Sequence, residues 1–148
     1  MMTKILLPTD GSKQAEIAGE HAIATADISG SDIIVLYVVD IGYLEALPQQ
    51  DLRKDLEERL MKEGKDIVEE FKQKLEDSKC HGHCKNVSLI TMVKEGKPAD
   101  VILKTIDEEG VDQVIIGKSG KHGLDKLILG STTDRVVRGS KVPVNVIS

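Results

Sequence analysis

The sequence predicts an α/β fold in which a parallel sheet carries helices on both faces. Short, continuous apolar runs recur along the chain, as expected for strands that are covered on both sides. Helical patterns fill the intervals between these runs, and strands that alternate with helices form parallel sheets with right-handed crossovers. A length of 148 residues with 40% apolar residues suits one domain with an aliphatic core.

Five segments have the pattern of strands. They are residues 4–7, 33–39, 87–93, 114–116 and 142–147. The third segment alternates apolar and polar residues more than the others, which favours an edge strand. Pro143 places the fifth segment at a sheet edge or at a strand start, because proline has no N–H to donate to a ladder.

Two helices are expected in the first half of the chain. Ser12 is a good N-cap for the first one, whose small, alanine-rich face can lie close against a sheet. A longer helix runs from about Asp51 to Leu75, and its apolar stripe begins at Leu52. Gly64 interrupts this helix at a cost of about 1 kcal/mol relative to alanine.

Two more helices are expected in the second half. Pro98 suits the first turn of one helix, and Gly110 closes it. The last helix begins at Ser131 and stops at Gly139. The predicted order is therefore strand and helix in strict alternation, from a first strand to a fifth.

Composition narrows the class of partner. The net charge is -5 and aromatic residues make up 2%, so neither a basic face nor stacking platforms for nucleic acid are expected. No run approaches the roughly 20 apolar residues of a membrane span, and the N-terminus enters a strand pattern instead of a signal peptide. With only two cysteines, the chain suits a reducing compartment, and we expect a cytoplasmic protein without membrane partners.

Two glycine-rich turns near the end of the chain predict a phosphate-binding site. Gly117, Lys118 and Gly120 follow the fourth strand, and Gly130 with Ser131 opens the last helix nine residues later. Glycine lets backbone amides approach an anion closely, and a helix N-terminus adds unpaired N–H groups and a positive dipole end. The alternative is that the glycines only make tight turns, but local positive charge favours nucleotide binding.

A second turn follows the first strand and ends in Asp10, Gly11 and Ser12. Ligands of such sheets bind beyond the carboxyl ends of the strands, where the strand order reverses. If the first and fourth strands are neighbours, the two loops form one pocket. Asp10 is also part of a good turn and helix entry by itself, so we interpret it as having both roles.

Together these residues resemble the universal stress protein family, and specifically its ATP-binding branch. That branch is marked by a glycine, two residues, a glycine, nine residues, and a glycine followed by serine or threonine. Gly117, Gly120, Gly130 and Ser131 match this spacing without an insertion. The likeness also covers residues 5–12, 37–40 and 96–98, so residues 1–148 are expected to form a single nucleotide-binding domain.

The resemblance implies a Rossmann-like, five-stranded sheet of order 3-2-1-4-5 that binds ATP, or AMP or ADP, with magnesium or manganese. Asp10 would approach the adenosine end, the backbone of Val38 would meet the adenine edge, and the Gly117 region would line the ribose. The implied cofactor-binding residues are Pro8, Thr9, Asp10, Val38, Gly117, Lys118, Gly120, Gly130, Ser131 and Thr132. Family members commonly have a small hydroxyl residue at the position that Lys118 occupies in this chain. The lysine either supplies charge to phosphate or points to solvent.

Members of the family commonly dimerise through the last strand, and an unpaired edge at residues 142–147 suits that pairing. The implied function is a dimeric, nucleotide-dependent sensor or switch in the stress response that acts on an unknown protein partner. A slow ATP hydrolase is one alternative, although the chain has no Gly-x-x-x-x-Gly-Lys-Ser/Thr loop and no evident catalytic base. A nucleotide-free interaction module is the other.

One cluster stands outside the family pattern. Cys80, His81, His83 and Cys84 are residue types that bind zinc or copper. Four ligands within five residues can hardly all turn onto one ion, so a complete site would need a partner chain. The alternative, which we favour, is a polar loop between the second helix and the third strand.

Overall fold

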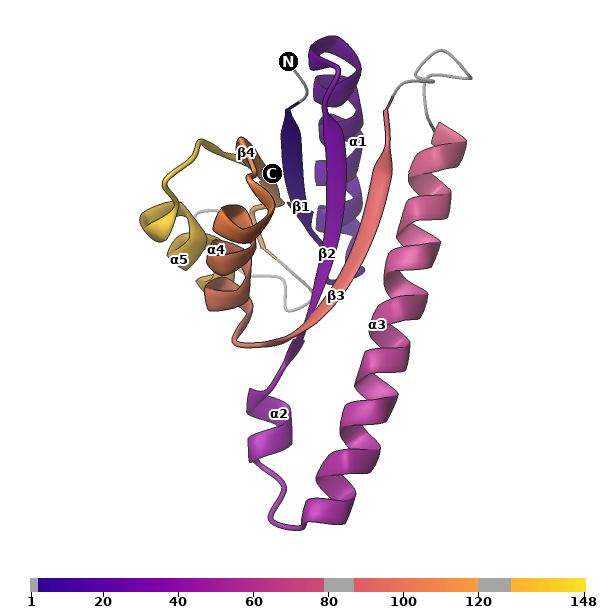
Figure 1. The fold of residues 1–148 in the computed structure, drawn as a ribbon, viewed down its shortest axis with the longest axis vertical. Helices are drawn as coiled ribbons and strands as arrows, with labels where there is room; N and C mark the ends of the chain where they lie inside the picture. Colours follow the sequence, from indigo (N-terminus) through magenta and orange to yellow (C-terminus); the bar gives the residue numbers. More distant parts are fainter. Residues whose placement is uncertain (1–2, 79–86, 120–128) are drawn as a thin grey trace.

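A five-stranded parallel sheet of order β3-β2-β1-β4-β5 forms the centre of the fold (Figure 1). This computed structural model describes residues 3–78, 87–119 and 129–148. The strands are β1 (Lys4–Pro8), β2 (Asp32–Asp40), β3 (Leu89–Gly96), β4 (Gln113–Gly117) and β5 (Val144–Ile147). The parallel sheet and the strand order that the family resemblance implied are confirmed.

Helices cover both faces of the sheet, as predicted (Figure 1). The helices are α1 (Lys13–Ser29), α2 (Gly42–Glu45), α3 (Gln50–Ser78), α4 (Pro98–Glu109) and α5 (Ser131–Gly139). One apolar core lies between the sheet and the pair α1 and α3, and a second core lies between the sheet and the pair α4 and α5. The short helix α2 was not predicted. Within the described ranges, no helix is long and apolar enough to cross a membrane.

The predicted start of α1 is confirmed. Ser12 has an extended backbone, and its hydroxyl oxygen accepts a hydrogen bond from the amide of Ala15 at 3.2 Å. Ala18, Ala22 and Ala26 are fully buried against the sheet, so the helix axis lies close to the strands. A close helix brings its first turn up to the carboxyl ends of β1 and β4.

Helix α3 is longer than the strands that it covers, and its N-terminal turns extend past their ends (Figure 1). Phe71 and Leu75 are buried in the core, whereas Leu52 is 50% exposed. Figure 1 shows why: α2 and the N-terminal turns of α3 extend beyond the carboxyl ends of β2 and β3. The apolar stripe predicted from Leu52 onward is therefore covered fully only in the C-terminal part of the helix.

Gly64 of α3 is a contact point between the helix and the sheet. A Cβ atom at this position would lie 2.7 Å from Cδ1 of Tyr37 on β2 and 3.0 Å from Cγ1 of Val93 on β3. Contacts under 3.0 Å require a shift of one partner. The glycine therefore lets the helix approach the two strands, which explains its presence despite its poor helix propensity.

Strand β3 ends three residues later than the alternating pattern predicted. Its register pairs Asp40 with Gly96, so Lys94 and Glu95 belong to the strand. The ammonium group of Lys94 donates a hydrogen bond to the hydroxyl of Thr105 at 2.8 Å and lies 3.6 Å from the carboxylate of Glu108. A lysine that reaches partners on α4 is compatible with a strand, although it breaks the apolar pattern.

Candidate functional site

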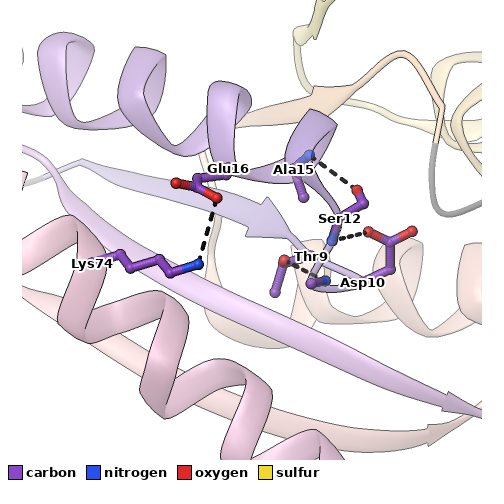
Figure 2. Close-up of polar contacts among 7 residues, drawn as sticks. Thr9, Asp10, Ser12, Ala15, Glu16 and Lys74 are labelled. Carbon is purple, nitrogen blue, oxygen red and sulfur yellow. Dashed lines mark hydrogen bonds and ion pairs between the residues drawn. The ribbon is translucent and has the colours of Figure 1, made fainter.

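The turn between β1 and α1 is fixed by its own polar groups (Figure 2). The hydroxyl oxygen of Thr9 accepts a hydrogen bond from the amide of Gly11 at 3.0 Å, and Oδ1 of Asp10 accepts one from the amide of Ser12 at 2.9 Å. Gly11 has a φ of +79°, a conformation that residues with a side chain rarely adopt. The turn therefore holds the half-buried carboxylate of Asp10 in place at the end of β1.

The end of β4 lies beside this turn. Leu6 pairs with Val114, and the same register continued to the strand ends places Thr9 opposite Gly117. A Cβ atom at Gly117 would lie 3.2 Å from the carbonyl carbon and oxygen of Gln14 in α1. The structure thus brings Pro8, the turn after it and Gly117 to one edge of the sheet, as predicted for neighbouring strands.

The N-terminus of α5 completes this edge. The amide of Gly130, the N-cap, donates a hydrogen bond to the carbonyl of Lys118 at 2.9 Å. As a glycine, this N-cap has no side chain with which to cap the helix, in contrast to Ser12 at α1. The first N–H groups of a helix have no partner inside it, so the amides of Ser131 and Thr132 are directed away from the helix body.

The two glycines leave room that a side chain would fill. A Cβ atom at Gly130 would lie 3.3 Å from Cα of Ser119 and 3.4 Å from the carbonyl oxygen of Lys118. Gly130 has a φ of −58°, so its backbone conformation alone does not require glycine. Close approach to the loop after β4 is what the glycine permits, and the combination with a helix N-terminus whose N-cap has no side chain suits an anion.

Val38 lies at the same edge of the sheet but not at the last position of its strand. β1 ends at Pro8, opposite Leu36, so Val38 lies two residues beyond the paired part of β1 and β2. On its other side Val38 is in register with Lys94 of β3. Its half-buried side chain packs toward the core on the α4 side of the sheet.

Two residues that the sequence analysis did not select hold the loops together. The buried hydroxyl of Thr133 donates a hydrogen bond to the carbonyl oxygen of Gly117 at 2.9 Å. Gln14 of α1 forms the wall against which Gly117 packs. Thr133 directly follows the selected pair Ser131 and Thr132. Its burial and its hydrogen bond appear only in the structure. Nothing in the sequence pattern marks Gln14.

Several predicted residues lie outside the described residues. These are Gly120 of the glycine motif and the cluster Cys80, His81, His83 and Cys84. In the ranges that are described, no group of three or more histidine, cysteine, aspartate or glutamate residues is placed to hold a metal ion.

Comparison with known proteins identifies relatives along the whole chain. The sequence profile described as "Universal stress protein family" matches residues 1–148. A universal stress protein of Methanocaldococcus jannaschii is 31% identical over 144 residues, which are 97% of this chain and 81% of the relative. Another from the same archaeon is 33% identical over 161 aligned positions, covering 99% of this chain and 95% of the relative. A solved structure of this second protein has a TM-score of 0.83 at 34% identity and covers 98% of this chain and 94% of its own.

Two more distant solved structures contain adenine nucleotides. An Arabidopsis thaliana protein of the same family has AMP bound; its TM-score is 0.65 at 20% identity, over 98% of this chain and 90% of its own. A universal stress protein in complex with cAMP has a TM-score of 0.68 at 19% identity, over 98% of this chain and 95% of its own. At these identities the likeness to this chain is one of fold.

Proposed function

The chain belongs to the universal stress protein family, and we propose that it is an ATP-binding member that acts as a dimeric, nucleotide-dependent sensor or switch. Residues 1–148 then form one nucleotide-binding domain. The observation that carries this proposal is the meeting of a helix N-terminus, whose N-cap Gly130 has no side chain, with the strand end at Gly117. More distant proteins of the same fold bind AMP and cAMP, which supports an adenine nucleotide as the ligand.

The proposed phosphate site is built from backbone N–H groups. The amides of Ser131 and Thr132 lie at the positive end of the α5 dipole, where an anion is stabilised. Their hydroxyl groups add donors to the same site. Gly120, which the family motif places among the phosphate-binding residues, would contribute a further amide.

The proposed nucleoside site lies across the edge toward β2. Asp10 is held at the end of β1 by its hydrogen bond to Ser12 and would accept hydrogen bonds from the adenosine end of the ligand. The backbone of Val38, beyond the paired part of β1 and β2, would meet the edge of the adenine base. Thr9 and Lys118 would complete the wall between these two parts.

Magnesium or manganese would accompany the nucleotide. The phosphate oxygens would supply most of its ligands, since Mg²⁺ in nucleotide sites is usually held by substrate phosphates and one or two carboxylates. The cation would neutralise phosphate charge. We assign no catalytic residue, and phosphate release at saturating ATP and magnesium is expected to stay at the background rate.

The proposed dimer uses the free edge of β5. In the described part of the chain β5 pairs with β4 alone, and Val144 and Val146 are only half-buried there. An open strand edge is a template for a second chain. Sedimentation velocity over a range of protein concentrations tests the dimer, and a monomer at every concentration would contradict it.

Calorimetric titration of nucleotide-free protein tests the binding proposal. ATP with magnesium is expected to bind, and parallel titrations with ADP, AMP and cAMP rank the nucleotides. Binding of none of them would leave an interaction module of the same fold. A partner search with and without ATP then tests whether occupancy changes protein contacts.

A further inference from the structure

Helix α3 touches the turn that carries Asp10. A Cβ atom on Gly11 would lie 3.2 Å from Cγ2 of Ile67 and 3.7 Å from its Cδ1. Ile67 is half-buried and lies among the partly buried positions of α3, between Gly64 and Phe71. The side chain of Ile67 therefore occupies the space beside Gly11 that a side chain at this position would need.

A second contact joins the same two parts of the molecule. The ammonium group of Lys74 on α3 lies 3.7 Å from Oε2 of Glu16 on α1 (Figure 2). Both side chains are well exposed, so this ion pair adds little stability by itself. It does show that α3 runs along the turn and the first turns of α1 for about two helical turns, from Ile67 to Lys74.

Two hydrogen bonds tie the residues of the turn to one another. Hydrogen bonds from Gly11 to Thr9 and from Ser12 to Asp10 fix four consecutive residues relative to one another. A ligand that displaces the carboxylate of Asp10 is therefore expected to displace Gly11 as well. Gly11 has a left-handed backbone and Ile67 of α3 fills the adjacent space, so a movement of Gly11 would meet this side chain first.

We propose that the contact between Gly11 and Ile67 couples nucleotide binding at Asp10 to helix α3. This inference rests on the proposed function and adds the element through which occupancy is reported. Ile67 acts as a positioning residue for the turn and does not contact the ligand. The helix is suited to this role because its N-terminal turns extend beyond the sheet, where Leu52 is half exposed. Coupling of this kind is reciprocal, so α3 also adjusts the affinity of the site.

Hydrogen exchange of the full chain with and without ATP and magnesium tests the coupling. In the wild type, ATP is expected to slow exchange of α3 amides around Ile67 by at least about fivefold, the lower end of ordinary coupling between sites. Ile67→Leu keeps the side-chain volume but removes the branch at Cβ that meets Gly11. This variant is expected to bind ATP and to lose most of the α3 response.

Two control variants separate coupling from general weakening of the helix. Ile67→Val keeps the branched Cβ and is expected to keep the response of α3. Leu60→Ala shortens another half-buried side chain of the same helix, about two turns away, and is also expected to keep it.

The outcomes distinguish the coupling from the proposed function. ATP binding without any change in α3, or an equal change in Ile67→Leu and Ile67→Val, would overturn the coupling alone. Absence of ATP binding in the wild type would overturn the proposed function and the coupling with it. If the α3 response is lost in Ile67→Leu and kept in both control variants, the contact between Gly11 and Ile67 is supported as the route of the coupling.

Discussion

The hydroxyl group of Thr133 donates a hydrogen bond to the carbonyl oxygen of Gly117, with 2.9 Å between the two oxygen atoms. The bond joins the first turn of α5 to the end of β4, sixteen residues earlier in the chain. Both groups are buried, so neither has water as an alternative partner. It fixes the N-terminus of α5 relative to the sheet, and with it the proposed phosphate site.

Thr133→Val removes this hydrogen bond while keeping the shape of the side chain. We expect the free energy of unfolding to fall by about 1–3 kcal/mol, because the carbonyl of Gly117 stays buried without its donor. Urea denaturation measures the change. Thr132→Val is the matched control: its half-buried hydroxyl is proposed to face phosphate, so ATP affinity should fall with little change in stability. Equal stability of both variants and the wild type would contradict this assignment.

Gly64→Ala should destabilise the protein although alanine is the better helix former. The gain in helix propensity is about 1 kcal/mol. The added Cβ would meet Tyr37 at 2.7 Å and Val93 at 3.0 Å, and overpacking of this kind typically costs about 1–3 kcal/mol. Chemical denaturation should show a net loss. Lys65→Ala, at the exposed neighbouring position, should be nearly neutral, and a more stable Gly64→Ala variant would disprove the close contact.

Ser12→Ala should lower the stability of the first helix. The lost hydrogen bond to the amide of Ala15 is an N-cap, and such changes cost about 1 kcal/mol. Thermal and urea unfolding measure the loss of stability. Ser12→Asp should have the stability of the wild type, because aspartate is an equally good cap. Lys13→Ala, one residue later and exposed, is the control. A Ser12→Asp variant that is no more stable than Ser12→Ala would argue against capping.

Glu95→Gln should raise stability at neutral pH by a small amount. Partial loss of solvation, the charge of Glu57 and a hydrogen bond with that side chain raise the pKa of the largely exposed Glu95 above its ordinary value. The folded state therefore holds the proton more tightly than the unfolded chain, and stability falls as pH rises through this pKa. The advantage of the variant should be present above the folded pKa and vanish at pH below the ordinary glutamate pKa of about 4.3.

Denaturation curves at several pH values test this sign. Glu20→Gln removes the same charge from the exposed surface of α1 and corrects for the change in net charge. An advantage of Glu95→Gln that grows toward low pH would contradict the raised pKa.

The fold could be predicted in large part because its signals are local. Ser12, Pro98 and Gly110 mark helix ends by their own chemistry, and the structure has them where the sequence placed them. The alternation of strands and helices indicated a parallel sheet. The strand order depends on long-range pairing and came from the family resemblance, not from any single segment.

The parts that were not predicted depend on contacts between distant residues. From the sequence alone Gly64 only weakens α3, whereas the ring of Tyr37 beside it is the reason for the glycine. Lys94 broke the apolar pattern of β3, and only its partners on α4 explain how it fits a strand. Of the site, the local turn chemistry was foreseen, whereas Thr133 and Gln14 become visible only when α5 and α1 lie against β4.

The central claim is that the N-terminus of α5, whose N-cap is Gly130, binds the phosphates of ATP. Gly130→Val is expected to keep cooperative unfolding, because its φ of −58° suits any residue, although Ser119 and Lys118 must shift slightly. Gly30→Ala, just before β2 at the amino ends of the strands and with a φ of +71°, should lose stability and keep binding. Calorimetric titration with ATP and magnesium should show binding by the wild type and at least about 100-fold weaker binding by Gly130→Val, a loss of roughly 2.7 kcal/mol or more. Equal affinities of a folded Gly130→Val variant and the wild type would contradict the account.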